Sequence, residues 1–290
     1  MNTLITLIRR EFWEHRALWI APLAVAALVM LGAVIGHASI GSETATADPS
    51  VRKSLFGVAL LVFGIPQWIT LSVILWFYSV DCLYAERKDR SILFWKSMPV
   101  SDLKTVLSKF LVAALIVPFG VFVVTSVTSL LFCAVWALRG LFDPSVVNLW
   151  DTGTWFRIQG LTLVGVLVAT LWYAPLTAYL LMLSAWARRN ISVWAIVPPL
   201  AAVIVEQIAF HTHHLRTILA YRLGGILQEF HLGQLFIEGS GESPGAEPMR
   251  GLANIHPAAA FANIDLWLGL LFAAALVLAA VRIRRYRDDT

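Results

Sequence analysis

Apolar residues form six long runs along the chain, and shorter polar stretches separate these runs. A helix needs about 20 apolar residues to cross roughly 30 Å of hydrocarbon. Backbone amides in lipid must bond within their own segment, so each crossing should be helical. The pattern therefore predicts an all-α integral membrane protein with six transmembrane helices, over residues 18–38, 57–80, 106–137, 160–185, 191–210 and 263–281.

Two of the predicted spans, the third and the fourth, are longer than a bilayer requires. Each contains a proline, Pro118 in the third and Pro175 in the fourth. Proline removes a backbone donor and clashes with the preceding turn, so we expect these spans to bend or tilt.

Composition agrees with a membrane protein, because 59% of the 290 residues are hydrophobic and only 14% are charged. Ordinary soluble domains are about half apolar and a quarter charged. Apolar runs extend from end to end, so we expect one membrane domain over residues 1–290. The net charge of +4 comes from basic residues that flank the runs, which indicates membrane orientation and no nucleic-acid partner. Cys82 and Cys133 lie in or beside apolar runs, so we expect no disulfide.

Most of the 22 lysines and arginines flank one set of span ends. The positive-inside rule then places both termini in the cytoplasm, in agreement with an even number of spans. The polar lead contains Glu11 and Glu14, and the apolar run after it exceeds a signal-peptide core. We therefore expect no cleaved signal peptide.

The first 17 residues have the pattern of an amphipathic helix. Leu4, Leu7, Ile8 and Phe12 belong to its apolar side, together with Ile5 and Trp13. The polar side is predicted to carry Arg9, Arg10, Glu11, Glu14 and Arg16. We favour a helix lying on the inner membrane surface, and the alternative is a straight extension of the first span.

The largest outer loop is predicted at residues 211–262. A helix is expected over residues 215–232, broken at Gly224 and Gly225, because adjacent glycines often end regular structure. The apolar stretch 252–261 is too short to span, and it is a possible re-entrant segment before the last span.

Glu206 lies inside the fifth apolar run, and a carboxylate within a membrane is a functional candidate by default. Glu206 is expected in the outer third of the span. The alternative to a functional role is a structural one, in which the carboxylate is paired or hydrated near the membrane surface. His211, His213 and His214 follow it, but their spacing matches no standard zinc site. We therefore expect no metal and favour a hydrated interfacial cluster.

Residues 81–105 form a predicted cytoplasmic loop, and residues 86–109 read ERKDRSILFWKSMPVSDLKTVLSK. Glu86 and Arg90 are spaced to pair on a helix face. Pro99 ends a first helix, and Ser101 with Asp102 suits the start of the next. From the residues alone, a coupling element and a membrane-surface hairpin remain equally good interpretations.

This stretch resembles the signature of ABC-2 type transporter permeases. The shared features are Glu86–Arg87 after the second span, Asp89 and Ser91, the apolar 92–95, the Pro99–Val100–Ser101 corner and Lys109. The N-terminal helix with Arg10–Glu11, the six spans and the large outer loop extend the resemblance over the whole chain. Arg90 and Lys96 depart from it, since Gly and an apolar residue are common there.

The resemblance implies a membrane subunit of a bacterial inner-membrane exporter. Two permease copies, as a homodimer, would work with two copies of a separate ABC ATPase, which binds ATP and Mg²⁺. This chain has no GxxxxGK loop, so we expect no cofactor on it and no enzymatic activity of its own. Glu86 would orient the coupling region by pairing with the N-terminal helix or Arg90. The implied ATPase-coupling residues are Glu86, Arg87, Lys88, Asp89, Arg90, Ile92, Leu93, Trp95, Pro99, Val100 and Ser101.

The implied cargo is hydrophobic or amphipathic, and its identity does not follow from the sequence. The alternative function is a stand-alone secondary transporter or channel using Glu206, although such proteins usually carry several ionisable groups near the midplane. A membrane-embedded metalloprotease is disfavoured, because the sequence has no HExxH motif.

Overall fold

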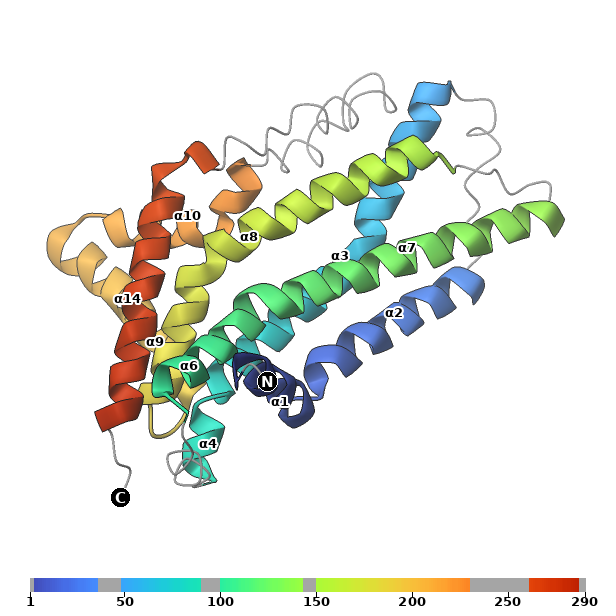
Figure 1. Cartoon of the computed structure of the whole chain (residues 1–290). Helices are drawn as coiled ribbons and strands as arrows, with labels where there is room; N and C mark the ends of the chain where they lie inside the picture. Colours follow the sequence, from blue (N-terminus) through green and yellow to red (C-terminus); the bar gives the residue numbers. More distant parts are fainter. Residues whose placement is uncertain (1–2, 36–47, 90–99, 143–149, 230–260, 287–290) are drawn as a thin grey trace.

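The computed structural model describes residues 3–35, 48–89, 100–142, 150–229 and 261–286. Every regular element in these ranges is helical (Figure 1). The first half contains α1 (Thr3–Glu14), α2 (Ala17–Ile35), α3 (Pro49–Asp81), α4 (Tyr84–Lys88), α6 (Asp102–Leu111), the π-helical η2 (Val112–Ile116) and α7 (Val117–Phe142). The second half contains α8 (Thr152–Trp186), α9 (Ile191–Val205), the π-helical η3 (Glu206–Phe210), α10 (His214–Glu229) and α14 (Ile264–Tyr286).

Six helical segments are long and apolar enough to cross a membrane, and each overlaps one predicted span. The prediction of an all-α chain with six such helices is therefore confirmed for the described residues. The segments are Ala17–Ile35, Val51–Lys88, Asp102–Leu141, Thr152–Trp186, Ile191–Phe210 and Ile264–Tyr286.

The two prolines in the long spans have different consequences. Pro118 is the second residue of α7, just after η2, where the helix widens from α to π geometry. A proline cannot donate to the carbonyl four residues earlier, and a π turn accommodates the disturbed ladder. Pro175 lies inside α8, which runs on without interruption and bends along its length (Figure 1).

The main apolar core lies where α2, α3, α6, α7, α8 and α14 meet. Leu71 and Ile74 of α3 pack there with Val117 and Leu181. Small side chains on α8 and α14, including Ala178 and Ala273, allow these two helices to approach closely. Away from this core the helices expose large apolar side chains, as expected for surfaces that face lipid.

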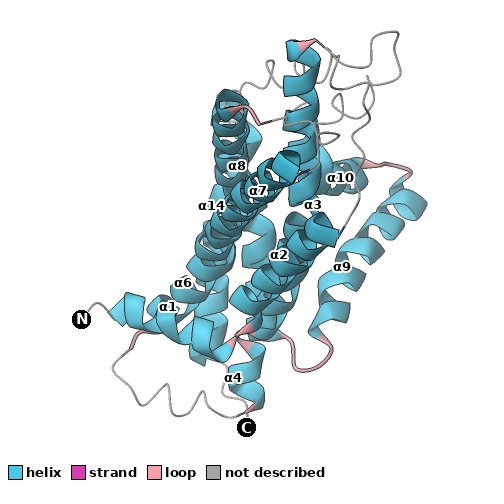
Figure 2. Ribbon diagram, turned by 90° about the vertical axis from the view of Figure 1, so that its right-hand side faces the viewer, coloured by secondary structure: helices cyan, strands magenta, loops and turns pink. Residues whose placement is uncertain are grey.

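α9 stands at the edge of the bundle (Figure 2). Only Ile191 and Ala195 of this helix are buried. Its remaining apolar residues are left for lipid or for another protein.

α1 is a separate helix, because a turn at His15 and Arg16 divides it from α2. α1 lies across the end of the bundle while α2 runs along it (Figure 2). The alternative of a straight extension of the first span is therefore wrong, and the position of α1 on a membrane surface stays a prediction. α1, α4 and the C-terminal end of α14 all lie at this same end of the molecule (Figures 1 and 2).

The outer-loop prediction was partly wrong. α10 continues through Gly224 and Gly225 instead of breaking there, and neither residue has a positive φ. Gly225 serves close packing, since a Cβ at this position would lie 3.2 Å from the Trp172 ring. Almost all of the possible re-entrant segment 252–261 falls outside the described residues.

Candidate functional site

A buried ion pair lies between α1 and α6 at the end of the bundle that holds α1. The side chains of Glu11 and Lys109 are both fully inaccessible to solvent. The Lys109 Nζ donates to both carboxylate oxygens of Glu11, at 2.8 and 2.9 Å. The Tyr78 hydroxyl at the end of α3 donates to Glu11 Oε2 at 2.9 Å.

Glu86 on α4 contacts Lys109 and joins this pair to two further cations, Arg10 and Arg284. Its Oε1 lies 2.6 Å from Arg10 Nη2 and 3.2 Å from Lys109 Nζ. Its Oε2 lies 2.5 Å from Nη1 of Arg284, near the C-terminal end of α14. The Arg284 Nε then reaches Asp102 Oδ1 of α6 at 3.1 Å. We call these residues the ionic cluster: Arg10, Glu11, Tyr78, Glu86, Asp102, Lys109 and Arg284.

Local helix chemistry helps to place several of these charges. Glu86 and Asp102 occupy the first turns of α4 and α6, where the helix dipole favours carboxylates. Arg284 occupies the last turn of α14, where the dipole favours a cation. Ser101 caps α6 by accepting from the Lys104 backbone N–H at 3.4 Å, as predicted.

Three cations of the ionic cluster face its three carboxylates, and Arg10 also pairs with the exposed Glu14 at 3.2 Å. Burial opposes the charge on Arg10, yet Glu11 and Glu86 raise its pKa above the ordinary value. Removal of one partner from such a buried set leaves an uncompensated charge. The cluster therefore couples the positions of α1, α4, α6 and α14.

α4 has a second anchor on its other side. The Arg87 guanidinium donates to the carbonyls of Ser184 and Ala187, at 2.6 and 2.8 Å, at the end of α8. The Ser184 hydroxyl accepts from the backbone N–H groups of Leu83 and Tyr84, both at 3.1 Å. The beginning of the predicted coupling segment is thus fixed to four other helices, α1, α6, α8 and α14.

The structure allows a partial comparison with the predicted coupling residues. The predicted contact of Glu86 with the N-terminal helix is confirmed by its pairing with Arg10. Lys88 and Asp89 are exposed at the tip of α4, Ser101 is exposed, and Val100 is half-buried. Arg90, Ile92, Leu93, Trp95 and Pro99 lie outside the described residues, so the expected Glu86–Arg90 pairing stays a prediction.

Known proteins supply no further assignment for this arrangement. No protein-family model, curated protein or solved structure matches this chain. The resemblance of the loop to ABC-2 permeases therefore rests on the residues quoted for it, and the docking role of the loop stays a prediction.

The sequence pattern misassigned the faces of α1. Glu11 was placed on the polar side but is fully buried, whereas Ile5 and Trp13 are 64% and 70% exposed. The reason is that Lys109 and Tyr78 supply partners inside the protein that sequence periodicity does not reveal.

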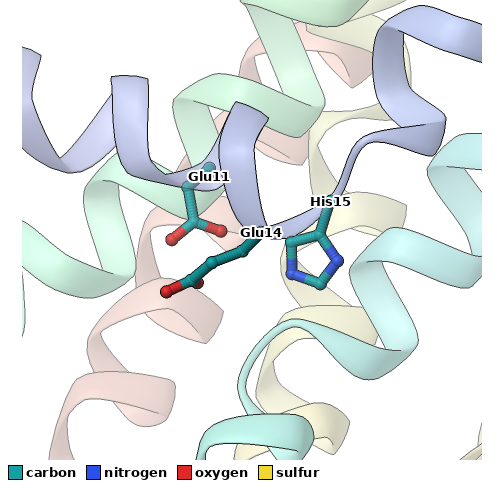
Figure 3. A group of neighbouring side chains, drawn as sticks. All are labelled: Glu11, Glu14 and His15. Carbon is teal, nitrogen blue, oxygen red and sulfur yellow. The ribbon is translucent and has the colours of Figure 1, made fainter.

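Glu11, Glu14 and His15 lie close together at the end of α1 (Figure 3). Their candidate ligand atoms are within 4.8 Å of one another, which is metal-like spacing. Both Glu11 oxygens, however, already accept from Lys109. The arrangement therefore fits an ion-pair cluster better than a metal centre.

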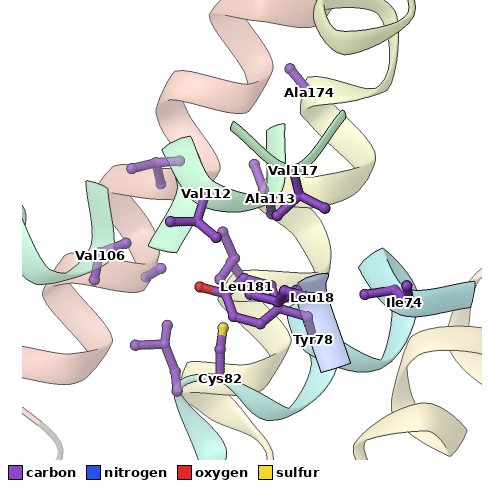
Figure 4. Close-up of a cluster of buried hydrophobic side chains, with 14 of the residues drawn as sticks. Leu18, Ile74, Tyr78, Cys82, Val106, Val112, Ala113, Val117, Ala174 and Leu181 are labelled. Carbon is purple, nitrogen blue, oxygen red and sulfur yellow. The ribbon is translucent and has the colours of Figure 1, made fainter. Parts of the chain in front are cut away.

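The ionic cluster borders the apolar core directly. Tyr78 packs with Cys82, Val106 and Leu181 in the core (Figure 4). Its ring also meets the His15 ring edge-on, with centroids 5.0 Å apart. Tyr78 therefore links the buried charges to the packed interior.

Glu206 accepts hydrogen bonds from three donors that lie a few residues further along the chain. Its Oε1 accepts from the Thr212 hydroxyl and the His214 backbone N–H, both at 2.9 Å, and its Oε2 accepts from the Leu215 N–H at 2.8 Å. These are the contacts of a cap on α10. The side chains of His211, His213 and His214 are exposed.

Sequence reasoning undervalued three members of the ionic cluster. Neither Tyr78 nor Arg284 was predicted to contact the carboxylates of this cluster. Lys109 was quoted as part of the motif. The burial of Lys109 could have been predicted from the sequence. Lys109 lies between Val106 and Ala113 at helical spacing, so it belongs to the apolar face that packs into the core.

Proposed function

We propose that this chain is an ABC-2 type permease, the membrane subunit of an ATP-driven exporter in the bacterial inner membrane. Both termini would be cytoplasmic, two copies would form a homodimer, and two separate ABC ATPase subunits would bind ATP and Mg²⁺. The observation that carries the proposal is the ionic cluster, which joins the start of the resembling segment to α1, α6 and α14.

The geometry suits the transmission of force. Lys88 and Asp89 project at the tip of α4, where a cytoplasmic partner can reach them. Any displacement of the tip is resisted by Glu86 on one side and Arg87 on the other. Since separating the buried pairs is costly, the helices bound to α4 move with it.

The proposed cargo is hydrophobic or amphipathic. Outside the ionic cluster, the described helices present mainly apolar side chains along their lengths. Export as the direction of transport follows from the family resemblance.

The test is affinity purification of the tagged chain from native membranes in a mild detergent. The expected result is stoichiometric co-elution of a polypeptide with a GxxxxGK phosphate loop and ATPase activity. Lys88→Glu reverses a charge at the exposed tip and should weaken this association about tenfold, as expected for a charge mismatch at an interface. Arg157→Glu is the matched control, because Arg157 is exposed near the opposite end of α8.

Two results would count against the proposal. One is elution of the folded chain without an ATPase under conditions that preserve a known transporter complex. The other is equal loss of the partner in Lys88→Glu and Arg157→Glu, which would show that the tip of α4 is not the contact.

A further inference from the structure

An apolar groove of about 200 Å³ lies between α2 and η2–α7, beside the end of α1. Leu18, Trp19, Pro22 and Leu23 form one wall, all within the first two turns of α2. Val117 and Val121 belong to the opposite wall. Every side chain along the groove is apolar, so it offers contacts to a hydrocarbon chain and no hydrogen bonds.

Gly120 opens one side of the groove. A Cβ placed on this residue would meet nothing within 4 Å. Trp19 and Leu23 are about half exposed across from it, so the groove is reached from the surrounding membrane. The space is therefore accessible to a lipid chain and is not filled by the protein itself.

Two exposed cations lie next to groove residues along the chain. Arg9 comes one helical turn before Phe12, which lines the groove. Arg16 comes two residues before Leu18, and Trp13 is also exposed. The Arg9 guanidinium lies 5.3 Å from the Trp13 ring centroid. Within the described residues, neither arginine has a carboxylate at salt-bridge distance, in contrast to Arg10.

We propose that this groove binds one acyl chain of an anionic phospholipid, whose headgroup pairs with Arg9 and Arg16. The proposal needs only that the chain spans a bilayer and does not depend on an ATPase partner. The groove lies in the first turns of α2, so it sits at the depth of the leaflet next to α1. The arginines and Trp13 would then lie at headgroup level, where basic and aromatic side chains favour anionic lipid.

The charge pattern selects this occupant over a second copy of the chain. A two-fold contact centred on this face would bring Arg9 and Arg16 of one copy near those of the other, and like charges repel. An anionic phospholipid matches both the apolar groove and the two arginines, because its acyl chain fills the groove and its phosphate pairs with the arginines.

The test is native mass spectrometry of the purified full chain with phosphatidylglycerol or phosphatidylcholine of the same acyl chains. Wild type should bind phosphatidylglycerol more tightly, by about fivefold for each arginine engaged. Arg9→Gln/Arg16→Gln should bind the two lipids equally. Gly120→Leu fills the groove and should lose the first bound molecule of both lipids.

Gly160→Leu is the matched control, because Gly160 is also exposed and also faces open space, on α8. It should bind both lipids as wild type does, and circular dichroism should show unchanged helix content in all variants. Equal binding of the two lipids by wild type overturns the proposal. Undiminished phosphatidylglycerol binding by Gly120→Leu also overturns it. Loss of the dimer in Gly120→Leu with unchanged lipid binding overturns it as well, because the groove would then be a contact between two copies of the chain.

Discussion

Among the residues of the ionic cluster, replacement of Lys109 should reduce the stability of the folded protein most. Its side chain is fully buried and bonds Glu11 and Glu86 together. A surface pair, Lys53 with Asp151 at 3.4 Å, offers a comparison within the same protein, with the Lys53 side chain 50% exposed. The contrast separates the effect of burial from the effect of pairing.

Lys109→Met should destabilise the folded protein by about 3–5 kcal/mol, because two carboxylates lose their shared cation inside the protein. Lys53→Met should cost less than about 1 kcal/mol. Thermal unfolding in detergent, followed by circular dichroism, measures both. If Lys109→Met and Lys53→Met have the same melting temperature, Lys109 is not part of a buried ionic network.

His15 should give the protein a pH-dependent stability. Burial lowers the pKa of His15 below its ordinary value of 6.5. The folded state therefore resists a proton that the unfolded chain accepts, so stability should fall as pH drops from about 7.5 through the ordinary pKa of 6.5. His15→Gln should flatten the melting temperature over this range. Burial raises the pKa of Glu14, so an opposing contribution enters only at lower pH.

Single residues were predictable from sequence where the cause is local. Ser101 as a cap and Asp102 in the first turn of α6 follow from chain neighbours alone. Pairing of Glu86 with the N-terminal helix was one of two predicted alternatives, and only the fold brings Glu86 and Arg10, so distant in sequence, within 2.6 Å. Arg284 was beyond prediction, because no local rule states which of several basic residues at a helix end turns inward.

At the level of elements, Glu206 and α10 form one unit. The carboxylate accepts from two backbone N–H groups at the start of α10. Helix N-termini leave such donors unsatisfied, and a capping side chain contributes about 1–2 kcal/mol. The alternative of a secondary transporter would instead require Glu206 to bind and release an ion or a proton.

Glu206→Ala should speed amide hydrogen exchange at residues 212–216, while exchange in α8 stays unchanged. Glu206→Gln retains one accepting oxygen and should show a smaller increase. Unaltered exchange in Glu206→Ala would refute the capping role and return attention to ion-coupled transport.

Helix positions were largely predictable, because a long apolar run has few alternatives in lipid. The fifth predicted span, 191–210, coincides with the apolar helical segment Ile191–Phe210. α3 extends beyond its predicted span, since Ser50 to Phe56 continue the helix without being strongly apolar. The continuity of α10 through two glycines was missed, because close packing of Gly225 on Trp172 is a tertiary effect.

For the whole molecule, the proposed function predicts which end of the helix bundle faces the cytoplasm. α4 and the start of α8 lie at opposite ends of the bundle (Figure 1). The exposed Lys88 of α4 and the exposed Arg157 near the start of α8 should therefore lie on opposite sides of the membrane. A membrane-impermeant maleimide should label Arg157→Cys in intact cells and Lys88→Cys only after the membrane is opened. Cys82 and Cys133 are buried, so background labelling should be low. Labelling of both positions from the same side would contradict the proposed topology.

Site-specific crosslinking in native membranes tests whether an ATPase docks at the tip of α4. A photo-crosslinking amino acid in place of Asp89 should capture a polypeptide that carries a GxxxxGK loop. The same amino acid in place of Arg157 should not. Capture of that ATPase from position 89 alone is the predicted result. Absence of an ATPase adduct at position 89, in a chain that is folded and inserted, would contradict the account.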